Sequence, residues 1–132
     1  MGTRIAVWID HHHARVFDVH ADPLRHHHTA TERTVTAPHH RAHRHQRGHD
    51  GEGHEHPQDV VHFFAEVRRL LAGAEALFIL GPASAKHELV AHLDAHDRRL
   101  AATVIGVETV DHPTDREIVA LAAERFLRQT VR

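Results

Sequence analysis

The sequence contains no cysteine in its 132 residues. This absence excludes disulfide bonds, thiolate nucleophiles, iron–sulfur clusters and every zinc finger that needs a cysteine ligand. Imidazole and carboxylate groups are then the side chains left to hold a metal ion. Lysine is almost absent too, since Lys86 stands alone beside fifteen arginines. Contacts to phosphate groups would therefore fall mainly to the planar guanidinium group, which can form two hydrogen bonds to them.

Long apolar runs are also missing. The longest, Ala76–Leu80, is far shorter than the roughly 18 residues that a membrane-spanning helix requires. The first residues, Met1 to Arg4, lead directly into alternating sequence without the apolar core of a signal peptide. We therefore expect a cytoplasmic protein with no membrane partner.

Histidine is the residue in excess. The 19 histidines outnumber the 16 basic and the 18 acidic residues, so the formal net charge of −2 depends strongly on pH. A hydrophobic content of 41% is ordinary for a globular protein, and the length suits a single domain over residues 1–132.

Three short strands are expected before residue 37. Segments 4–10 and 14–20 are rich in β-branched and aromatic residues, and the histidines between them indicate the turn of a hairpin. A weaker third strand is expected at 32–36. In the hairpin Phe17 and Val19 share one face, and we expect Val7 and Ile9 to lie on the same face as these two.

A polar segment separates these strands from the rest. Residues 37–57 contain no large apolar side chain, and seven histidines lie there among arginine, glycine and acidic residues. Loops of this length without secondary structure are usually functional or disordered. We expect residues 37–57, called here the His-rich loop, to be a flexible loop within the single domain.

The apolar period becomes helical after this loop. A wide stripe predicts a helix that begins at Pro57 or Gln58 and ends in a left-handed cap at Gly73. The stripe consists of Val60, Val61, Phe63, Phe64, Val67, Leu70 and Leu71. The run Ala76–Leu80 is continuous and apolar, as expected for a strand that is covered on both faces.

Two more helices and one more strand follow. Ser84 is expected to cap a helix that reaches about Asp97, and residues 103–108 are expected to form a strand. Thr114 to Glu117 has the pattern of a capping box. The helix that it opens carries Ile118, Leu121, Ala122, Arg125 and Phe126 at helical spacing.

This order of elements predicts an α/β protein. Strands joined by hairpins pair antiparallel, whereas strands joined through a helix pair parallel. We expect a mixed five-stranded sheet, with three antiparallel strands followed by two parallel strands, and three helices packed on it.

The second half of the chain resembles a known family. Ile-Leu-Gly-Pro-Ala-Ser-Ala-Lys-His-Glu-Leu at residues 79–89, followed by Val104–Val107, resembles the middle domain of archaeal and eukaryotic class I peptide-chain release factors and of Pelota. Asp-His-Pro-Thr-Asp at 111–115 is similar to a run in stand-alone bacterial release-factor-like proteins, often labelled translational machinery proteins. The resemblance implies a ribonuclease-H-like fold and a ribosome or tRNA partner, with no DNA partner expected.

The His-rich loop departs from this family. Release factors carry Gly-Gly-Gln on the loop between the third strand and the first helix, where it helps water to attack the peptidyl-tRNA ester. This sequence has Gln46-Arg47-Gly48 and Gly51-Glu52-Gly53 instead. We therefore expect no catalytic residues and no peptide release. The expected function is a non-enzymatic contact with ribosome or tRNA, in stalling, rescue or hibernation.

The residues expected to bind RNA are basic. Arg41, Arg44 and Arg47 are spaced three apart in the His-rich loop and could follow RNA phosphates, with an affinity that falls as salt rises. Lys86 lies at the start of the predicted second helix, where the helix dipole favours an anion. The alternatives are an arginine set neutralised by nearby acidic residues and a lysine exposed to solvent.

A different hypothesis is metal binding by the same loop. Imidazole is a common ligand of Zn²⁺ and Ni²⁺, and a protein that buffers or senses these ions could use the loop. The spacing matches no defined zinc finger, so a solvated tract without a ligand is the alternative. The candidate ligands are His39, His40, His43, His45, His49, His54 and His56.

A metal-dependent nuclease is the remaining alternative. Asp10, Glu108 and Asp111 are expected at strand ends, and carboxylates gathered there could hold two Mg²⁺ ions for phosphodiester cleavage. Asp10 has a simpler role open to it, which is to stabilise the hairpin turn.

Overall fold

The computed structural model describes residues 3–22, 27–37 and 57–130 of the chain. The strands are β1 (Thr3–Ile9), β2 (His13–Asp22), β3 (His27–Thr36), β4 (Ala74–Gly81) and β5 (Val104–Thr109). The helices are α2 (Pro57–Leu71), α3 (Ala85–His96), α4 (Arg98–Ala101) and α5 (Asp115–Thr130). None of the helices in these three stretches is both long and apolar enough to span a membrane.

The strands form one mixed sheet in the order β3-β2-β1-β4-β5. β1 pairs antiparallel with β2, and β2 pairs antiparallel with β3. β4 pairs parallel with both β1 and β5. The predicted α/β class is therefore confirmed, with three antiparallel strands followed along the chain by two parallel ones.

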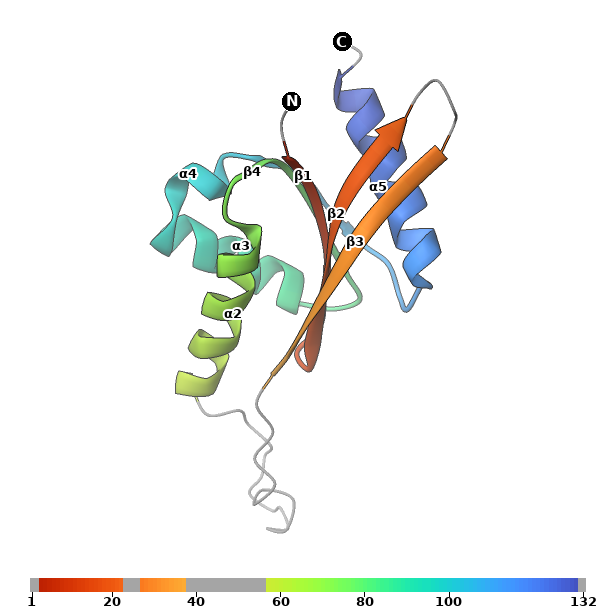
Figure 1. Cartoon of the computed structure of the whole chain (residues 1–132). Coiled ribbons are helices and arrows are strands. Elements are labelled where there is room, and N and C mark those ends of the chain that lie inside the picture. The colour runs from red at the N-terminus through yellow and green to blue at the C-terminus, as the bar shows by residue number, and fades with distance from the viewer. Residues whose placement is uncertain (1–2, 23–26, 38–56, 131–132) are drawn as a thin grey trace.

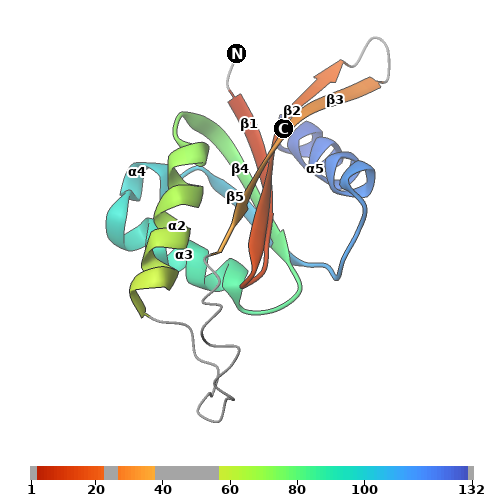
Figure 2. The same cartoon turned by 60° about the horizontal axis from the view of Figure 1, so that its bottom comes forward.

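Helices cover both faces of this sheet. α2, α3 and α4 lie on one face, and α5 lies on the other (Figures 1 and 2). Alternate residues of a strand point to opposite faces, so each central strand contributes to two cores. Ile5, Val7 and Ile9 pack with the α2 and α3 side, whereas Ala6 and Trp8 pack with α5. The strand β1 is therefore buried on both faces and lies at the centre of the molecule.

The described part of the chain contains four helices where three were expected. The additional helix is the short α4, which begins directly after α3 ends at His96. Asp97 separates the two helices, because its carboxylate accepts a hydrogen bond from the Leu100 backbone N–H at 3.1 Å and caps α4. Leu100 is buried in the core and fixes the direction of this turn.

The face assignment within the hairpin was wrong. Phe17 and Val19 share a core with Ala6 and Trp8, and not with Val7 and Ile9. The reason is the turn, in which Ile9 pairs with Ala14 and Asp10 donates its N–H to the His13 carbonyl at 3.1 Å. A shift of one residue in this register would move every side chain to the other face.

Other local predictions were met in part. β3 begins at His27, five residues before the expected strand at 32–36. Gly73 adopts the expected left-handed backbone, with φ of 87°. Ser84 precedes α3, but its side chain makes no capping hydrogen bond and donates instead to Glu88. Val61, predicted on the apolar stripe of the first helix, and Leu121, predicted at helical spacing in the last helix, are 50% and 38% exposed.

The capping box at the start of α5 is confirmed and predicts a measurable loss of stability. The Glu117 carboxylate accepts from the Thr114 N–H at 2.8 Å, and the Thr114 hydroxyl accepts from the Glu117 N–H at 3.1 Å. Thr114→Ala is expected to lower the free energy of unfolding by about 1 kcal/mol. Denaturant unfolding of Thr114→Ala, Glu117→Ala and the double variant would measure it. Strictly additive losses would contradict a reciprocal box.

Candidate functional site

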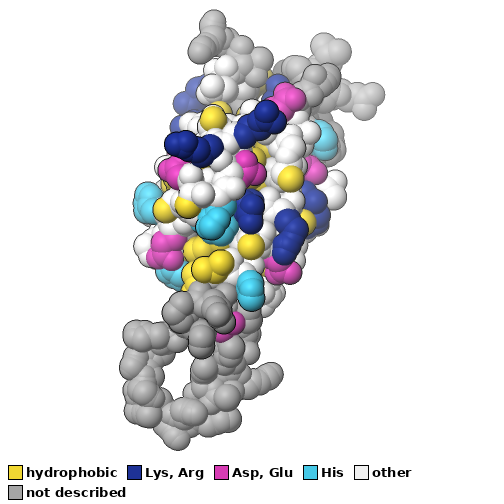
Figure 3. Space-filling model, turned by 90° about the vertical axis from the view of Figure 1, so that its left-hand side faces the viewer, with side chains coloured by type: hydrophobic (Ala, Val, Ile, Leu, Met, Phe, Trp, Pro, Cys, Tyr) yellow, Lys and Arg dark blue, Asp and Glu magenta, His cyan; other side chains and the backbone are white. Residues whose placement is uncertain are grey.

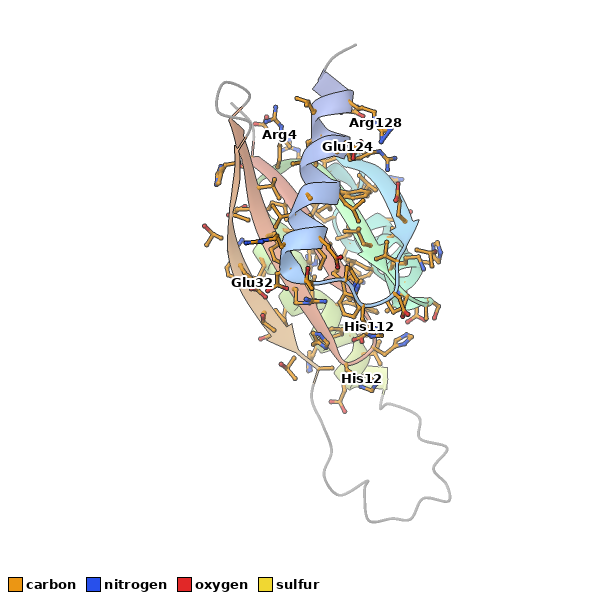
Figure 4. All side chains as sticks on the ribbon, turned by 90° about the vertical axis from the view of Figure 1, so that its right-hand side faces the viewer. Arg4, His12, Glu32, His112, Glu124 and Arg128 are labelled. Atoms are coloured by element: carbon orange, nitrogen blue, oxygen red, sulfur yellow. The ribbon has the colours of Figure 1, made fainter. Side chains whose placement is uncertain are left out.

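The candidate site lies where β1, β4 and β5 reach their carboxyl ends. In α/β proteins ligands bind at this end of parallel strands, because the loops that follow them meet there. Here the loops are the β1–β2 turn, the β4–α3 loop and the β5–α5 loop, and they bring His11, His12, His13 and His112 together at one end of the sheet, called here the histidine end. Figure 4 labels His12 and His112 at this end.

The His-rich loop begins at the histidine end. Ala37, the last described residue before 38–56, donates its backbone N–H to the His12 carbonyl at 2.8 Å. This bond ties the end of β3 to the β1–β2 turn. Ala37 therefore lies at the histidine end.

Trp8 is the buried residue against which the side chains of the histidine end pack. Its ring is completely buried, and its indole N–H donates to the Asp111 carbonyl at 3.0 Å. The imidazole rings of His13 and His112 lie 5.2 and 5.3 Å from the Trp8 ring, centroid to centroid. The Arg15 guanidinium lies 4.7 Å from the ring centroid, within the range of a cation–π contact. One buried aromatic ring therefore positions groups from the turn, from β2 and from the β5–α5 loop.

Arg15 connects this cluster to α5 and β3. It donates to the Asp115 carboxylate and, at 3.4 Å, to the Pro113 carbonyl. Glu32 of β3 lies beside Asp115: burial raises the pKa of Glu32, and a hydrogen bond to Asp115 and the negative charge of that group raise it further. The β5–α5 loop is thus held by polar contacts on the outer side as well as by Trp8.

Three of the end histidines have a carboxylate beside them. The distances from ring nitrogen to carboxylate oxygen are 3.2 Å for His11 and Glu88, 3.5 Å for His13 and Asp10, and 3.0 Å for His112 and Asp111. The His11 and His112 contacts are hydrogen bonds, and each uses one ring nitrogen of an imidazole that has two. The partners fix the orientation of the rings, as an outer carboxylate does for a histidine in a binding site.

Asp10 also holds the turn, as the simpler hypothesis predicted. Its carboxylate accepts from the backbone N–H groups of His12 and His13 at 2.8 and 2.9 Å. Burial alone would raise the pKa of Asp10, but these two donors and the charge of the two imidazoles outweigh it and lower the pKa. Asp10 therefore keeps its negative charge and its turn over the neutral pH range.

The nuclease arrangement is not formed by the described residues. Asp10 is engaged by the turn, Glu108 accepts a hydrogen bond from Arg125, and Asp111 pairs with His112. Within residues 3–22, 27–37 and 57–130 no group of three or more histidine or acidic side chains is placed to hold a metal ion.

Most of the residues singled out from the sequence lie outside the described part. This applies to the arginines Arg41, Arg44 and Arg47 and to the seven histidines of the His-rich loop, whose roles stay predictions. Lys86 is described; the alternative of an exposed lysine was wrong, and its role in RNA binding stays a prediction. Its side chain is 3% exposed, and its ammonium donates to the Ala83 carbonyl.

Sequence reasoning missed the centre of the site. Trp8 and Arg15 were assigned only to strands, and the histidines 11 to 13 only to a turn. The available signal was the single tryptophan directly before the triplet of histidines. Their link to His112 could not be found, because it joins positions about a hundred residues apart through the pairing of the sheet.

Comparison with known proteins shows a shared fold. No protein-family model and no curated protein matches the chain in sequence. The crystal structure of Archaeoglobus fulgidus Pelota matches with a TM-score of 0.63 and 15% identity, over 98% of this chain and 33% of that one. The chain has the fold of one part of Pelota.

Two further structures agree with this result. The archaeal translation termination factor aRF1 matches with a TM-score of 0.55 and 16% identity, over 92% of this chain and 34% of that one. A structure described as an archaeal protein matches with a TM-score of 0.57 and 12% identity, over 98% of this chain and 39% of that one. The Pelota-like and release-factor-like resemblance is therefore confirmed for the fold, and the chain spans 33% to 39% of the length of these proteins.

The role of Trp8 in this Pelota-like fold can be tested by Trp8→Phe. Phenylalanine keeps an aromatic ring but leaves the Asp111 carbonyl without the indole N–H. We expect a loss of about 1–2 kcal/mol in the free energy of unfolding, together with faster hydrogen exchange of backbone amides in 110–114. Unchanged exchange in that loop would contradict the proposed organising role.

Proposed function

We propose that this chain is a non-enzymatic, cytoplasmic, translation-associated protein that contacts ribosome or tRNA through the His-rich loop and the histidine end beneath it. The observation that carries the proposal is the fold shared with Pelota and the archaeal termination factor over 98% and 92% of the chain. The loop that would carry Gly-Gly-Gln in such a factor carries arginine and histidine instead. A role in stalling, rescue or hibernation follows, without hydrolysis of peptidyl-tRNA.

The chemistry of the histidine end supports an RNA contact. In His11 and His112 one ring nitrogen is hydrogen-bonded to a carboxylate, and the second ring nitrogen of an imidazole can also form a hydrogen bond. The three arginines of the loop would add charge that follows a phosphate backbone. Because such contacts release counterions, the affinity is expected to fall steeply as salt rises.

Co-sedimentation with ribosomes at low and high salt tests this function. The triple substitution of Arg41, Arg44 and Arg47 by glutamine is expected to reduce binding by about tenfold or more at low salt. The control is Arg116→Gln with Arg128→Gln, which removes exposed arginines from α5 and is expected to change binding little. Equal effects of the two sets, or retention that does not respond to salt, would contradict the proposal.

Metal binding is the second candidate function. The observation in its favour is the concentration of imidazoles, with four at the histidine end and seven in the loop that begins there. Binding of Zn²⁺ or Ni²⁺ is tested by elemental analysis of the untagged wild type and of one triple variant, which carries His49→Ala, His54→Ala and His56→Ala. A stoichiometry that is the same in both proteins would exclude these three histidines as ligands.

A further inference from the structure

A second polar cluster lies between α2 and α3. Phe64 and Arg68 are one turn apart on α2, and His92 and His96 are one turn apart on α3. The Phe64 and His92 ring centroids are 5.7 Å apart, and those of His92 and His96 are 4.4 Å apart. The positive charge of Arg68 acts on His92 across the seam between the two helices.

Two buried nitrogen atoms of this cluster have no hydrogen-bond partner among the described residues. They are Nε2 of His92, whose side chain is 9% exposed, and Nε of Arg68. Folded proteins rarely leave buried polar atoms unpaired, and such atoms commonly meet a water molecule, an ion or a ligand. A single small group placed against the seam could satisfy both.

The charge around the seam decides which group fits. No ion pair within the described residues involves Arg68, His92 or His96. Arg98 and Arg99 of α4 come shortly after His96 in the sequence, and Figure 3 shows histidine and Lys or Arg side chains, with Asp or Glu side chains among them, on the face formed by α2, α3 and α4. A guanidinium group repels a metal cation and attracts an anion. The cluster therefore favours an oxyanion.

We propose that Arg68, His92 and His96 form a binding site for a phosphate group. Arg68 donates its Nε–H to the phosphate, and His92 donates from Nε2 once it is protonated beside the anion. His96, at the exposed rim, closes the site. The phosphate belongs either to an RNA backbone or to free phosphate. That the phosphate belongs to RNA rests on the proposed function, whereas the existence of the site does not.

Titration of the full chain with inorganic phosphate tests the site. The experiment is done at about pH 6 in chloride buffer and follows the ring resonances of His92, which are assigned by their loss in His92→Gln. We expect saturable binding that is about tenfold weaker in Arg68→Gln, since a charged hydrogen bond is lost. Arg69→Gln is the matched control, because it removes the same charge from the exposed next position of α2. His96→Gln, also at an exposed position, is expected to weaken binding without affecting folding.

Two results would overturn the site. One is equal phosphate binding by the wild type, Arg68→Gln and Arg69→Gln. The other is no response of the wild type to phosphate; a response to Zn²⁺ that is lost in His92→Gln would then identify a metal site. Ribosome co-sedimentation then distinguishes the two sources of phosphate. Weaker retention of Arg68→Gln than of Arg69→Gln identifies RNA, and equal retention identifies free phosphate. If the wild type does not bind ribosomes, the proposed function fails while the phosphate titration still decides the site.

Discussion

Gly81→Ala is expected to lower the free energy of unfolding by about 3 kcal/mol or more, which is a large fraction of the total stability of a small domain. Gly81 is the last residue of β4, beside the last residue of β1. A Cβ atom at this position would overlap the Ile9 carbonyl oxygen at a distance that real Cβ atoms do not show. The obstacle is backbone in a central strand, so no side chain can rotate to make room. The strands β1 and β4 would have to separate at the histidine end.

The matched control is Gly73→Ala. Both substitutions remove the same conformational freedom from the unfolded chain, so that contribution cancels in the comparison. Among the described residues, no atom outside Gly73 and its two chain neighbours lies within 4 Å of a Cβ at this position, so the cost comes from the left-handed φ of 87° and is about 1 kcal/mol. Urea unfolding of both variants measures the difference. A loss for Gly81→Ala no larger than that for Gly73→Ala would contradict the close approach of the two strands.

The fold class could be predicted because its signals are local. The left-handed cap at Gly73 and the capping box at Thr114 each depend on residues within one helical turn, and both are present as expected. The faces of the hairpin could not be predicted in the same way. They depend on whether Ile9 pairs with Ala14 or with a neighbour, which the composition of the turn does not decide.

The candidate site was less accessible to sequence reasoning because its contacts are long-range. Lys86 was assigned to RNA binding, with an exposed lysine as the alternative, because lysine is rarely buried; in the structure it is buried and its ammonium donates to the Ala83 carbonyl. Ser84 is a residue type that caps helices, yet its hydroxyl donates a hydrogen bond to the Glu88 carboxylate four residues later. Both outcomes depend on which neighbours the tertiary fold brings close, and hydroxyl and ammonium groups accept several such partners.

Acidification is expected to destabilise the protein through His92. Burial is the main cause that lowers the pKa of His92 to about 4, and the positive charges of His96 and Arg68 lower it further. In the unfolded chain a histidine titrates near pH 6.5. Between these two values the unfolded chain takes up a proton that the folded protein does not, so the stability present above pH 6.5 is lost as the pH falls toward 4. The loss from this one group amounts to about 3 kcal/mol at most.

His92→Leu isolates this contribution. The variant is expected to match the wild type at pH 7 to within about 1 kcal/mol. The reason is that Nε2 of His92 has no hydrogen-bond partner in the wild type, so leucine removes no hydrogen bond of this atom. It is expected to lose much less stability than the wild type between pH 6.5 and 4.5, measured by urea unfolding in phosphate-free buffer. Glu32 acts in the opposite direction, because its raised pKa adds stability as the pH falls. Both proteins contain Glu32, so its contribution does not alter the difference between them. Identical pH profiles for the two would show that His92 takes up its proton in the folded state, and thus that the seam between α2 and α3 is open to water.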